Sequence, residues 1–273
     1  MFGMVFSIKP RRPAAGLDKG FAMAGATFET LYGFHPVCEA LQAGRRTFER
    51  VLIRQGRRDP RMDALRQLAE ARGVPLRTMD EAALNEMVGH TAHQGVCAQV
   101  GSLPYQDLPT LLDAAGPPVF LVLLDQVQDP HNLGAVIRTG YCAGVDGVVI
   151  PQDRAAGPSP AVSKASAGAL EHMPVARVPN LVNAMRFLKA NGFWLVGLDG
   201  NADQPLYDCD LTVPLGLIVG GEDKGLRPLV KRHCDFRVSI PHARPFNSLN
   251  ASVAAGLAIY EAFRQRARTA DHA

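Results

Sequence analysis

The 273-residue sequence is poor in cysteine, and its few cysteines are scattered. None belongs to a Cys-x-x-Cys pair; they are Cys38, Cys97, Cys142, Cys209 and Cys234. An odd, scattered set argues against a disulfide framework and a zinc site, and it favours the reducing cytoplasm. His90 and His93 lack the four-residue spacing of paired helical metal ligands. We therefore expect a cytoplasmic protein without a metal.

The sequence also lacks any apolar run of the roughly 20 residues that a membrane-spanning helix requires. Near the start, Lys9, Arg11 and Arg12 follow the short apolar stretch of residues 4–6. A secretory signal has the opposite order, so we interpret residues 1–28 as a flexible basic arm. With 47% hydrophobic and 20% charged residues, the chain is typical of globular proteins and long enough for two domains.

A strong overall charge is absent too, because the formal net charge is only +3. The charge is unevenly distributed: residues 1–101 hold 14 Lys and Arg against 10 Asp and Glu, and residues 102–273 hold 15 against 16. Seven arginines lie at positions 45, 46, 50, 54, 57, 58 and 61. Guanidinium groups can grip the phosphates of a nucleic acid, but most charge runs are simply solvated surface. Both interpretations stay open at this point.

Alternating helix and strand patterns predict two α/β blocks. The first extends over residues 29–101 and the second over residues 119–268, and the proline-rich residues 102–118 are a plausible linker. In the first block we expect helices at residues 35–43, 62–72 and 81–88, and strands at residues 50–54, 74–78 and 95–100.

The second block opens with the continuous apolar run VFLVLL (119–124), which is typical of a parallel strand buried on both faces. Helices separate most of the further strands expected at residues 147–150, 174–178, 193–198, 215–219 and 236–240. A final helix over residues 248–266 carries Leu249, Val253, Leu257 and Tyr260 on one side. This alternation predicts a mostly parallel sheet, in which ligands collect beyond the carboxyl ends of the strands.

The loop after the first of these strands contains Asn132, a typical helix N-cap, and leads into a helix that contains Arg138. Arg138 lies among apolar neighbours, so we expect it to be buried or half-buried. Such an arginine needs an anionic partner. That partner could be a bound phosphate or a carboxylate within the fold.

Two later loops have unusual compositions. Gly220 and Gly221 follow a predicted strand and would let a ligand lie against the backbone, although a simple turn explains them equally well. Glu222 would repel a pyrophosphate, so a neutral or cationic ligand fits this loop better. In the third loop Ser248 can cap the final helix, whereas capping does not account for Asn250 in the first turn.

At these residues the chain resembles the SpoU (TrmH) branch of the SPOUT RNA methyltransferases. The matching segments are DPHNLGAVIRT (129–139), IVGGEDKGL (218–226) and SIPHARPFNSLNASVAAGLAIYE (239–261). YGFHPVCEAL (32–41) and HQGVCAQV (93–100) resemble the ribosomal-protein-like RNA-binding domain of the RlmB-type enzymes, which methylate a guanosine ribose in bacterial large-subunit rRNA. With GALEHMPVARVPNL (168–181), the resemblance spans residues 32–261.

The resemblance implies a deep trefoil knot, a homodimer and S-adenosylmethionine-dependent methylation of a ribose 2′-hydroxyl in RNA. Donor contacts map onto Gly220, Ile240 and Leu249, with Val219, Gly221, Pro241 and Ser248 as neighbours. The catalytic and RNA-positioning residues map onto Asn132, Arg138, Glu222, Ser248 and Asn250. Arg138 of one subunit would serve the donor pocket of the other. Within this frame we expect RNA binding by Arg45, Arg46, Arg54, Arg57, Arg58 and Arg138.

The sequence departs from the family pattern at two places. Residues 244–247 read Arg-Pro-Phe-Asn where relatives have a glycine and small residues, which puts the shape of the third loop in doubt. Lys224 replaces a residue that is often acidic. Three alternatives remain: a tRNA methyltransferase, a non-catalytic RNA-binding ribosome-assembly factor, and a nucleotide-dependent oxidoreductase. The missing G-x-G-x-x-G fingerprint disfavours the oxidoreductase.

Overall fold

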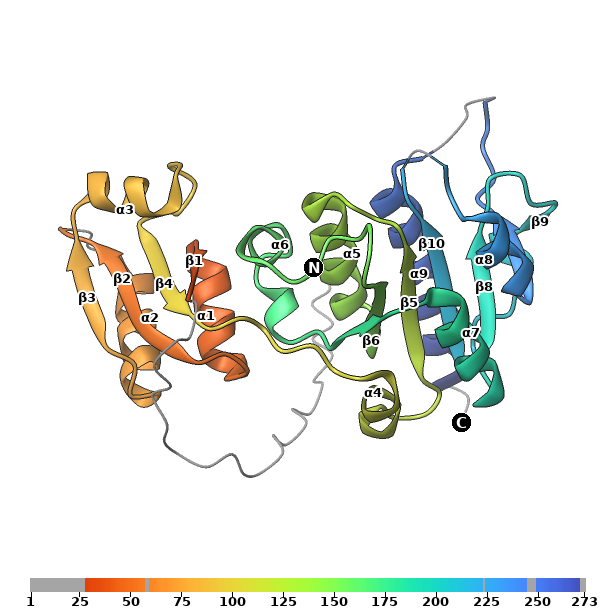
Figure 1. Ribbon diagram of the computed structural model, residues 1–273, viewed down its shortest axis with the longest axis horizontal. Coiled ribbons are helices and arrows are strands. Elements are labelled where there is room, and N and C mark those ends of the chain that lie inside the picture. Colours follow the sequence, from red (N-terminus) through yellow and green to blue (C-terminus); the bar gives the residue numbers. More distant parts are fainter. Residues whose placement is uncertain (1–27, 57–58, 223, 245–248, 271–273) are drawn as a thin grey trace, which may run out of the picture.

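The computed structural model describes residues 28–56, 59–222, 224–244 and 249–270 (Figure 1). The predicted basic arm, apart from Phe28, and the predicted site residues Arg57, Arg58 and Ser248 lie outside these ranges. The described chain forms two sheets, one of four strands and one of seven. No described helix is long and apolar enough to cross a membrane, and no metal-binding group of His, Cys, Asp or Glu occurs among the described residues.

The four-stranded sheet belongs to the first block and has the order β1-β4-β2-β3. Its strands are β1 (Glu29–Tyr32), β2 (Phe48–Arg54), β3 (Leu76–Met79) and β4 (Val96–Val100). The helices are α1 (Phe34–Ala43), α2 (Pro60–Ala71) and α3 (Glu81–Val88). The side chains of Asp59 and Asp80 accept backbone N–H groups and start α2 and α3. Only β1, which pairs antiparallel with β4, was not expected from the sequence.

The seven-stranded sheet has the order β7-β6-β5-β10-β8-β11-β9, and every pairing in it is parallel. Its strands are β5 (Phe120–Asp125), β6 (Gly147–Pro151), β7 (Val175–Val178), β8 (Trp194–Leu198), β9 (Gln204–Pro205), β10 (Leu215–Gly220) and β11 (Phe236–Ser239). The predicted parallel sheet is therefore confirmed. Strands β5 and β10 are fully buried, as their continuous apolar runs indicated.

Helices cover both faces of this sheet (Figure 1). One face packs against α5 (Pro130–Cys142), α6 (Pro160–Ala165) and α9 (Ala251–Ala270), with the short helical turns η1 (Ala169–Glu171) and η2 (Leu206–Asp208) beside them. The other face packs against α4 (Leu108–Ala114), α7 (Leu181–Ala190) and α8 (Pro228–His233). Consequently the carboxyl ends of β5, β8 and β10 and the helices that follow them meet at one edge.

Helix α4 lies within residues 102–118, which we interpreted as a linker. Asp107 caps it and Pro109 occupies its first turn, where proline needs no hydrogen-bond donor. Leu108 and Leu111 pack into the core beneath the large sheet. The prolines of this segment therefore begin a helix as well as interrupt one.

The side of helix α9 that carries its large apolar side chains faces solvent and not the core. Val253, Leu257 and Tyr260 are 50%, 42% and 50% exposed, and Phe263 is 44% exposed. The side that packs on α5 and the sheet consists mainly of small residues: Ala251, Ala255, Ala258, Ile259 and Ala262. The predicted helix is confirmed, but its large apolar residues lie on the surface of the single chain.

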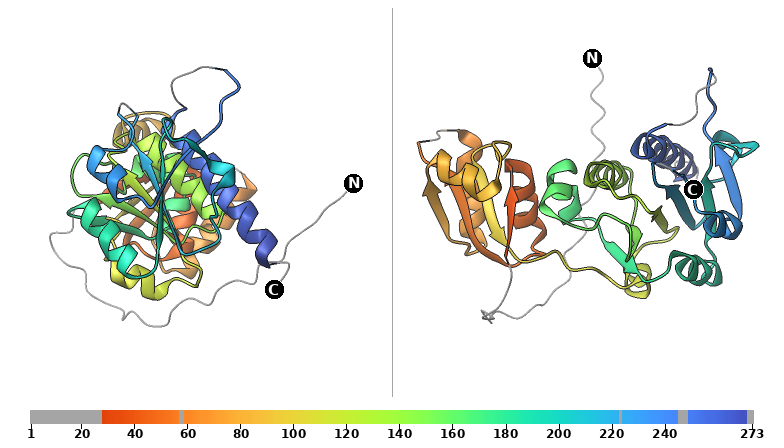
Figure 2. Two further views of the ribbon diagram at one scale, coloured as in Figure 1. Left: turned by 90° about the vertical axis from the view of Figure 1, so that its right-hand side faces the viewer. Right: turned by 45° about the horizontal axis from the view of Figure 1, so that its top comes forward.

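Two arginines that we expected to bind RNA instead join the two domains, where α1 and β1 meet α6 and η1 (Figure 2). The Arg46 side chain is fully buried and its Nε lies 2.7 Å from Glu171 Oε2, and Glu171 is itself fully buried. Arg45 Nη1 donates to the backbone oxygens of Glu171 and Met173. The prediction of RNA binding by Arg46 is wrong because its guanidinium has no access to solvent. Arg45 is half-buried, and RNA binding by Arg45 stays a prediction.

Candidate active site

Three loops that are distant in sequence meet at the carboxyl edge of the large sheet through a chain of side-chain hydrogen bonds. Asn132 Nδ2, in the first turn of α5, donates to Glu222 Oε1 after β10 at 2.5 Å. Asn250 Nδ2, just before α9, donates to Asn132 Oδ1 at 3.0 Å. Asn132 is 8% exposed, so both of its polar atoms are satisfied by these two neighbours. The structure thus brings together three of the predicted site residues.

The helix caps differ from those expected and explain why the amides are available. Asp129, not Asn132, caps α5 by accepting the backbone N–H of His131. The side chain of Asn132 is therefore free to reach Glu222 and Asn250. Asn250 Oδ1 accepts the backbone N–H groups of Ser252 and Val253 at 2.9 and 3.3 Å, so Asn250 performs the capping predicted for Ser248.

The two adjacent glycines of the second loop are required by close backbone approach. A Cβ on Gly220 would lie 2.2 Å from the carbonyl carbon of Gly225, and one on Gly221 would lie 2.5 Å from the oxygen of Gln126. Neither neighbour is a flexible side-chain end, so a larger residue would displace backbone. The loop is held there by a hydrogen bond from Gly221 N–H to the oxygen of Asp125 and by a bridge between Gly221 and Gly225.

A cavity of about 440 Å³, here called the donor cavity, opens beside these loops. Six residues predicted for the site line it: Val219, Gly220, Gly221, Glu222, Ile240 and Leu249. The predicted neighbour Pro241 does not line it. Its walls are mixed, with apolar side chains, exposed backbone and two carboxylates, those of Glu222 and Asp199.

Asp199 is a lining residue that sequence reasoning missed. It is 7% exposed, and Lys231 Nζ lies 2.9 Å from its Oδ2. Burial by itself would raise the pKa of Asp199, but the hydrogen bond and charge of Lys231, the Asn201 N–H and Arg237 lower the pKa overall. The carboxylate is therefore ionised at neutral pH. Its position directly after β8, at a strand end, is the signal that could have found it.

Family models match most of the described chain. A model of the SpoU rRNA methylase family matches residues 119–260, and a model of the RNA 2′-O ribose methyltransferase substrate-binding domain matches residues 30–106. The chain belongs to the SpoU rRNA methylase family. The resemblance stated from the sequence is thereby confirmed, and the first sheet belongs to a substrate-binding domain of that family.

Individual SpoU relatives match over nearly the whole chain. The Escherichia coli K12 protein named 23S rRNA (guanosine-2′-O-)-methyltransferase RlmB is 41% identical over 241 residues, which are 87% of this chain and 99% of that protein. The Synechocystis protein named uncharacterized tRNA/rRNA methyltransferase slr0955 is 43% identical over 93% of this chain and 67% of its own length.

Solved structures of SpoU proteins share the fold. AviRb from Streptomyces viridochromogenes, a SpoU methyltransferase in complex with the cofactor AdoMet, has a TM-score of 0.74 at 28% identity, covering 88% of this chain and 90% of its own. An AdoMet-bound rRNA methyltransferase from Sinorhizobium meliloti has a TM-score of 0.73 at 25% identity, covering 87% of each chain. The two-domain SpoU architecture is therefore shared with both.

Arg138 of this SpoU chain differs from its expected environment. It is exposed, because α5 turns Leu133, Val136 and Ile137 toward the core and Arg138 away from it. Within the described residues it has no hydrogen bond or ion pair, and it lines none of the three cavities near the sheet edge. The expectation that it is buried or half-buried in the single chain is wrong.

The remaining arginines of the predicted RNA surface lie in the substrate-binding domain. Arg54 is 40% exposed at its side chain and forms an ion pair with Glu81, whose side chain is 58% exposed. Arg57 and Arg58 follow β2 in the sequence and lie outside the described residues. RNA binding by these three residues stays a prediction.

Proposed function

We propose that this chain transfers the methyl group of S-adenosylmethionine to the ribose 2′-hydroxyl of a guanosine in large-subunit rRNA. The observation that carries this proposal is the hydrogen-bonded set Asn250–Asn132–Glu222 at the rim of a glycine-walled cavity. The names of the RlmB relatives, which align over both domains, support the substrate. The names of two structural neighbours with AdoMet support the donor.

The residues present fit S-adenosylmethionine. The donor cavity is within the size range of small-molecule sites, and its lining carries charges of both signs, the carboxylates of Glu222 and Asp199 and the ammonium groups of Lys224 and Lys231. Close-packed backbone at Gly220 and Gly221 leaves main-chain groups, together with Val219, Ile240 and Leu249, to hold the donor. Pro241 and Ser248 complete the set that the family implies. The bound donor would supply an electrophilic methyl group on a sulfonium.

The chain itself must position the ribose and help to remove its proton. Positioning alone can contribute up to about 7–11 kcal/mol. The guanidinium pKa above about 12 makes a neutral arginine rare, so Arg138 is a poor proton acceptor. We propose that Arg138 holds the adjacent phosphate and stabilises the developing alkoxide at O2′, while the proton leaves through phosphate or water.

The hydrogen-bonded side chains of Asn250, Asn132 and Glu222 would fix the geometry around the ribose. Asn132 accepts from Asn250 and donates to Glu222, so it ties the first turn of α5 to both other loops. In this proposal Asn132 and Glu222 orient the donor loop, and Asn250 and Ser248 contact the donor or the nucleotide.

We also propose a homodimer, in which Arg138 acts on the donor cavity of the partner subunit. Two observations support it. Arg138 lies outside the cavities of its own chain. Large apolar side chains are exposed on the outer side of α9, at Val253, Leu257, Tyr260 and Phe263, and Tyr141 of α5 is 47% exposed. Contiguous exposed apolar residues of this kind mark interaction surfaces.

The knot of the family is proposed for this chain as well. Strand β10 lies between β5 and β8, and the backbone at residues 225–226 passes directly against Gly220. These placements agree with a chain that threads through an earlier loop.

Mapping of ribose methylation by mass spectrometry tests the function. We expect rRNA from a strain lacking this gene to lose one 2′-O-methylguanosine, and the purified chain with S-adenosylmethionine to restore it. Loss of a tRNA methylation instead would favour the tRNA alternative. Unchanged rRNA and tRNA would favour the non-catalytic alternative. If the chain bound NADH and not S-adenosylmethionine, an oxidoreductase would replace the proposal.

A further inference from the structure

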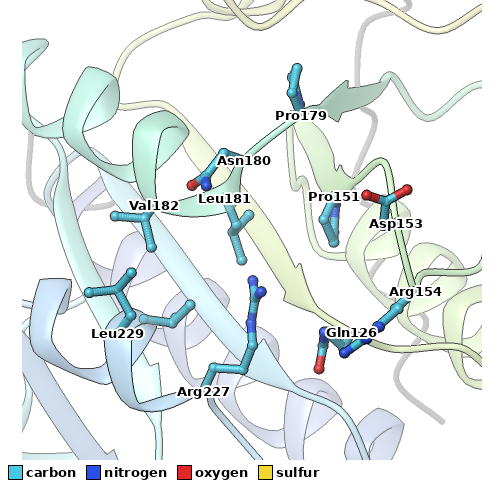
Figure 3. A pocket seen from close by; sticks show the side chains of 11 residues that line it. Gln126, Pro151, Asp153, Arg154, Pro179, Asn180, Leu181, Val182, Arg227 and Leu229 are labelled. Carbon is cyan, nitrogen blue, oxygen red and sulfur yellow. The ribbon is translucent and has the colours of Figure 1, made fainter.

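A second pocket, of about 310 Å³, lies at the carboxyl edge of the large sheet beside the donor cavity (Figure 3). We call it the arginine pocket and define it by Gln126, Arg154, Asn180, Leu181, Arg227 and Leu229. Its walls come from the ends of β5, β6 and β7 and from the segments that follow β10. None of these six residues belongs to the site described above.

Arg227 is held so that its outer nitrogens reach into this pocket. The fully buried carboxylate of Asp125 accepts both the Arg227 backbone N–H at 2.8 Å and Nε at 2.7 Å. The two Nη atoms, which Figure 3 shows pointing toward Leu181, have no hydrogen-bond partner among the described residues. The buried carboxylate of Asp125 thus holds the Arg227 guanidinium in place and leaves both of its Nη groups available to a ligand.

Arg154 adds a second available guanidinium. Figure 3 shows its side chain beside that of Gln126 on the wall of the pocket. Arg154 has no ion pair or hydrogen bond to any residue in the described ranges. Both Arg154 and Gln126 have left-handed backbones, with φ of 55° and 66°. Side-chain-bearing residues keep this conformation only where their surroundings enforce it, and such residues cluster at binding sites.

A third hollow shares lining residues with both the arginine pocket and the donor cavity. This hollow of about 340 Å³ is lined by Gln126 and Arg154, shared with the arginine pocket, and by Gly221, Glu222 and Gly225, shared with the donor cavity. A ligand that crosses this hollow would therefore extend from the arginine pocket to the rim that carries Glu222.

The chemistry of the pocket suits a nucleotide. Two guanidinium forks fit a phosphate. Leu181 and Val182 form an apolar floor, and Leu229, 46% exposed, adds an apolar wall for the face of a base. Gln126 and Asn180 supply amides for the base edge, and unpaired bases of RNA are commonly bound in this way.

We propose that the arginine pocket binds a nucleotide flanking the methylated ribose, with its phosphate held by Arg154 and Arg227. This inference rests on the proposed function, because it assigns part of the same RNA substrate. It makes the pocket a specificity site that selects which residue of the RNA reaches the donor cavity.

The variant Arg154→Ala tests this assignment, and Arg232→Ala is its matched control. Arg232 is an exposed arginine on α8 that lines none of the three cavities. Arg227 is left unchanged because its removal would strand the buried charge of Asp125. The binding assay uses an RNA that the wild type methylates. We expect Arg154→Ala to weaken the affinity for this RNA about tenfold and to reduce the salt dependence of that affinity, the slope of log K against log salt concentration, by about one. Donor affinity and melting temperature should stay at wild-type values, and Arg232→Ala should match the wild type throughout.

Neutral methylphosphonate linkages, placed one at a time around the methylated nucleotide, locate the contact. We expect one linkage at which the wild type and Arg232→Ala lose affinity and Arg154→Ala, which keeps only the Arg227 contact, loses less. Equal RNA affinity of Arg154→Ala and Arg232→Ala, or a parallel loss of donor affinity in Arg154→Ala, would overturn the assignment. A wild-type chain that methylates no RNA would instead refute the proposed function.

Discussion

An arginine cluster in one domain and two isolated arginines in the other differ in what they contact. Residues 45–61 of the substrate-binding domain hold the cluster, and every described member of it has a partner. Arg46 binds Glu171, Arg50 binds Gln99, Arg54 binds Glu81, Arg61 binds Asp59, and Arg45 binds backbone oxygens. In the methyltransferase domain Arg138 and Arg154 are isolated in sequence and have no partner in the described chain.

This difference shows that the density of arginines along a sequence is a poor guide to where an anion binds. A guanidinium that already has a carboxylate partner has little to gain from a phosphate, whereas an unpartnered one can supply all its donors. The buried and paired Arg46 therefore stabilises the fold, whereas Arg138, Arg154 and the Nη groups that Arg227 leaves unpaired are available to RNA. Four predictions test this difference.

The largest effect is expected at Arg138, the unpaired arginine of α5. Arg138→Ala should lower kcat by about 10²–10³, because a charge that stabilises the developing alkoxide is lost. Melting temperature should be unchanged, since Arg138 makes no hydrogen bond or ion pair within the described chain. Arg138→Lys separates the two mechanisms. Near-full turnover with an optimum moved toward the pKa of lysine would contradict our assignment and favour a proton-acceptor role.

A large effect on stability, and not on kcat, is expected at the buried ion pair of Arg46 and Glu171. Arg46→Met should lower the free energy of unfolding by about 3–5 kcal/mol, because Glu171 would keep a buried charge without its partner. Chemical denaturation measures this. The double variant Arg46→Met/Glu171→Leu should recover much of the loss. If Arg46→Met instead left stability unchanged and weakened RNA binding, the interdomain role would be wrong.

The strands and helices could largely be predicted from sequence because apolar runs and caps determine them locally. The strand of VFLVLL begins and ends within one residue of β5 as observed. The orientation of α9 could not be predicted, because alanines pack inward and the larger apolar side chains face outward. Periodicity identifies the two sides of a helix, but it does not say which side meets the chain's own core.

The candidate site was predictable in composition and less so in geometry. Asn132, Glu222 and Asn250 follow from motifs, and the structure joins them by hydrogen bonds. The exposure of Arg138 was missed, since its sequence neighbours are apolar while its own face of α5 points outward. Glu171, which both Arg45 and Arg46 contact, is more than 120 residues away from them, so no local pattern could indicate it.

A smaller effect is expected for three arginines of the substrate-binding domain. Arg54, Arg57 and Arg58 replaced together by Ala should weaken RNA binding about tenfold or more and flatten its salt dependence, because phosphate contacts are lost. Filter binding at several salt concentrations measures this, and calorimetry with S-adenosylmethionine should show unchanged donor affinity. Unchanged RNA affinity would move the RNA surface of this domain elsewhere.

The smallest effect is expected for the ion pair between Arg54 and Glu81. Both side chains are well exposed, so Glu81→Gln should change the free energy of unfolding by less than about 1 kcal/mol. The same variant should strengthen RNA binding slightly, because it frees the Arg54 guanidinium and removes a negative charge. This outcome would show that pairing, and not exposure alone, limits what Arg54 offers to a phosphate. If Glu81→Gln left RNA affinity unchanged while the triple variant lost it, Arg57 and Arg58 would carry the contact.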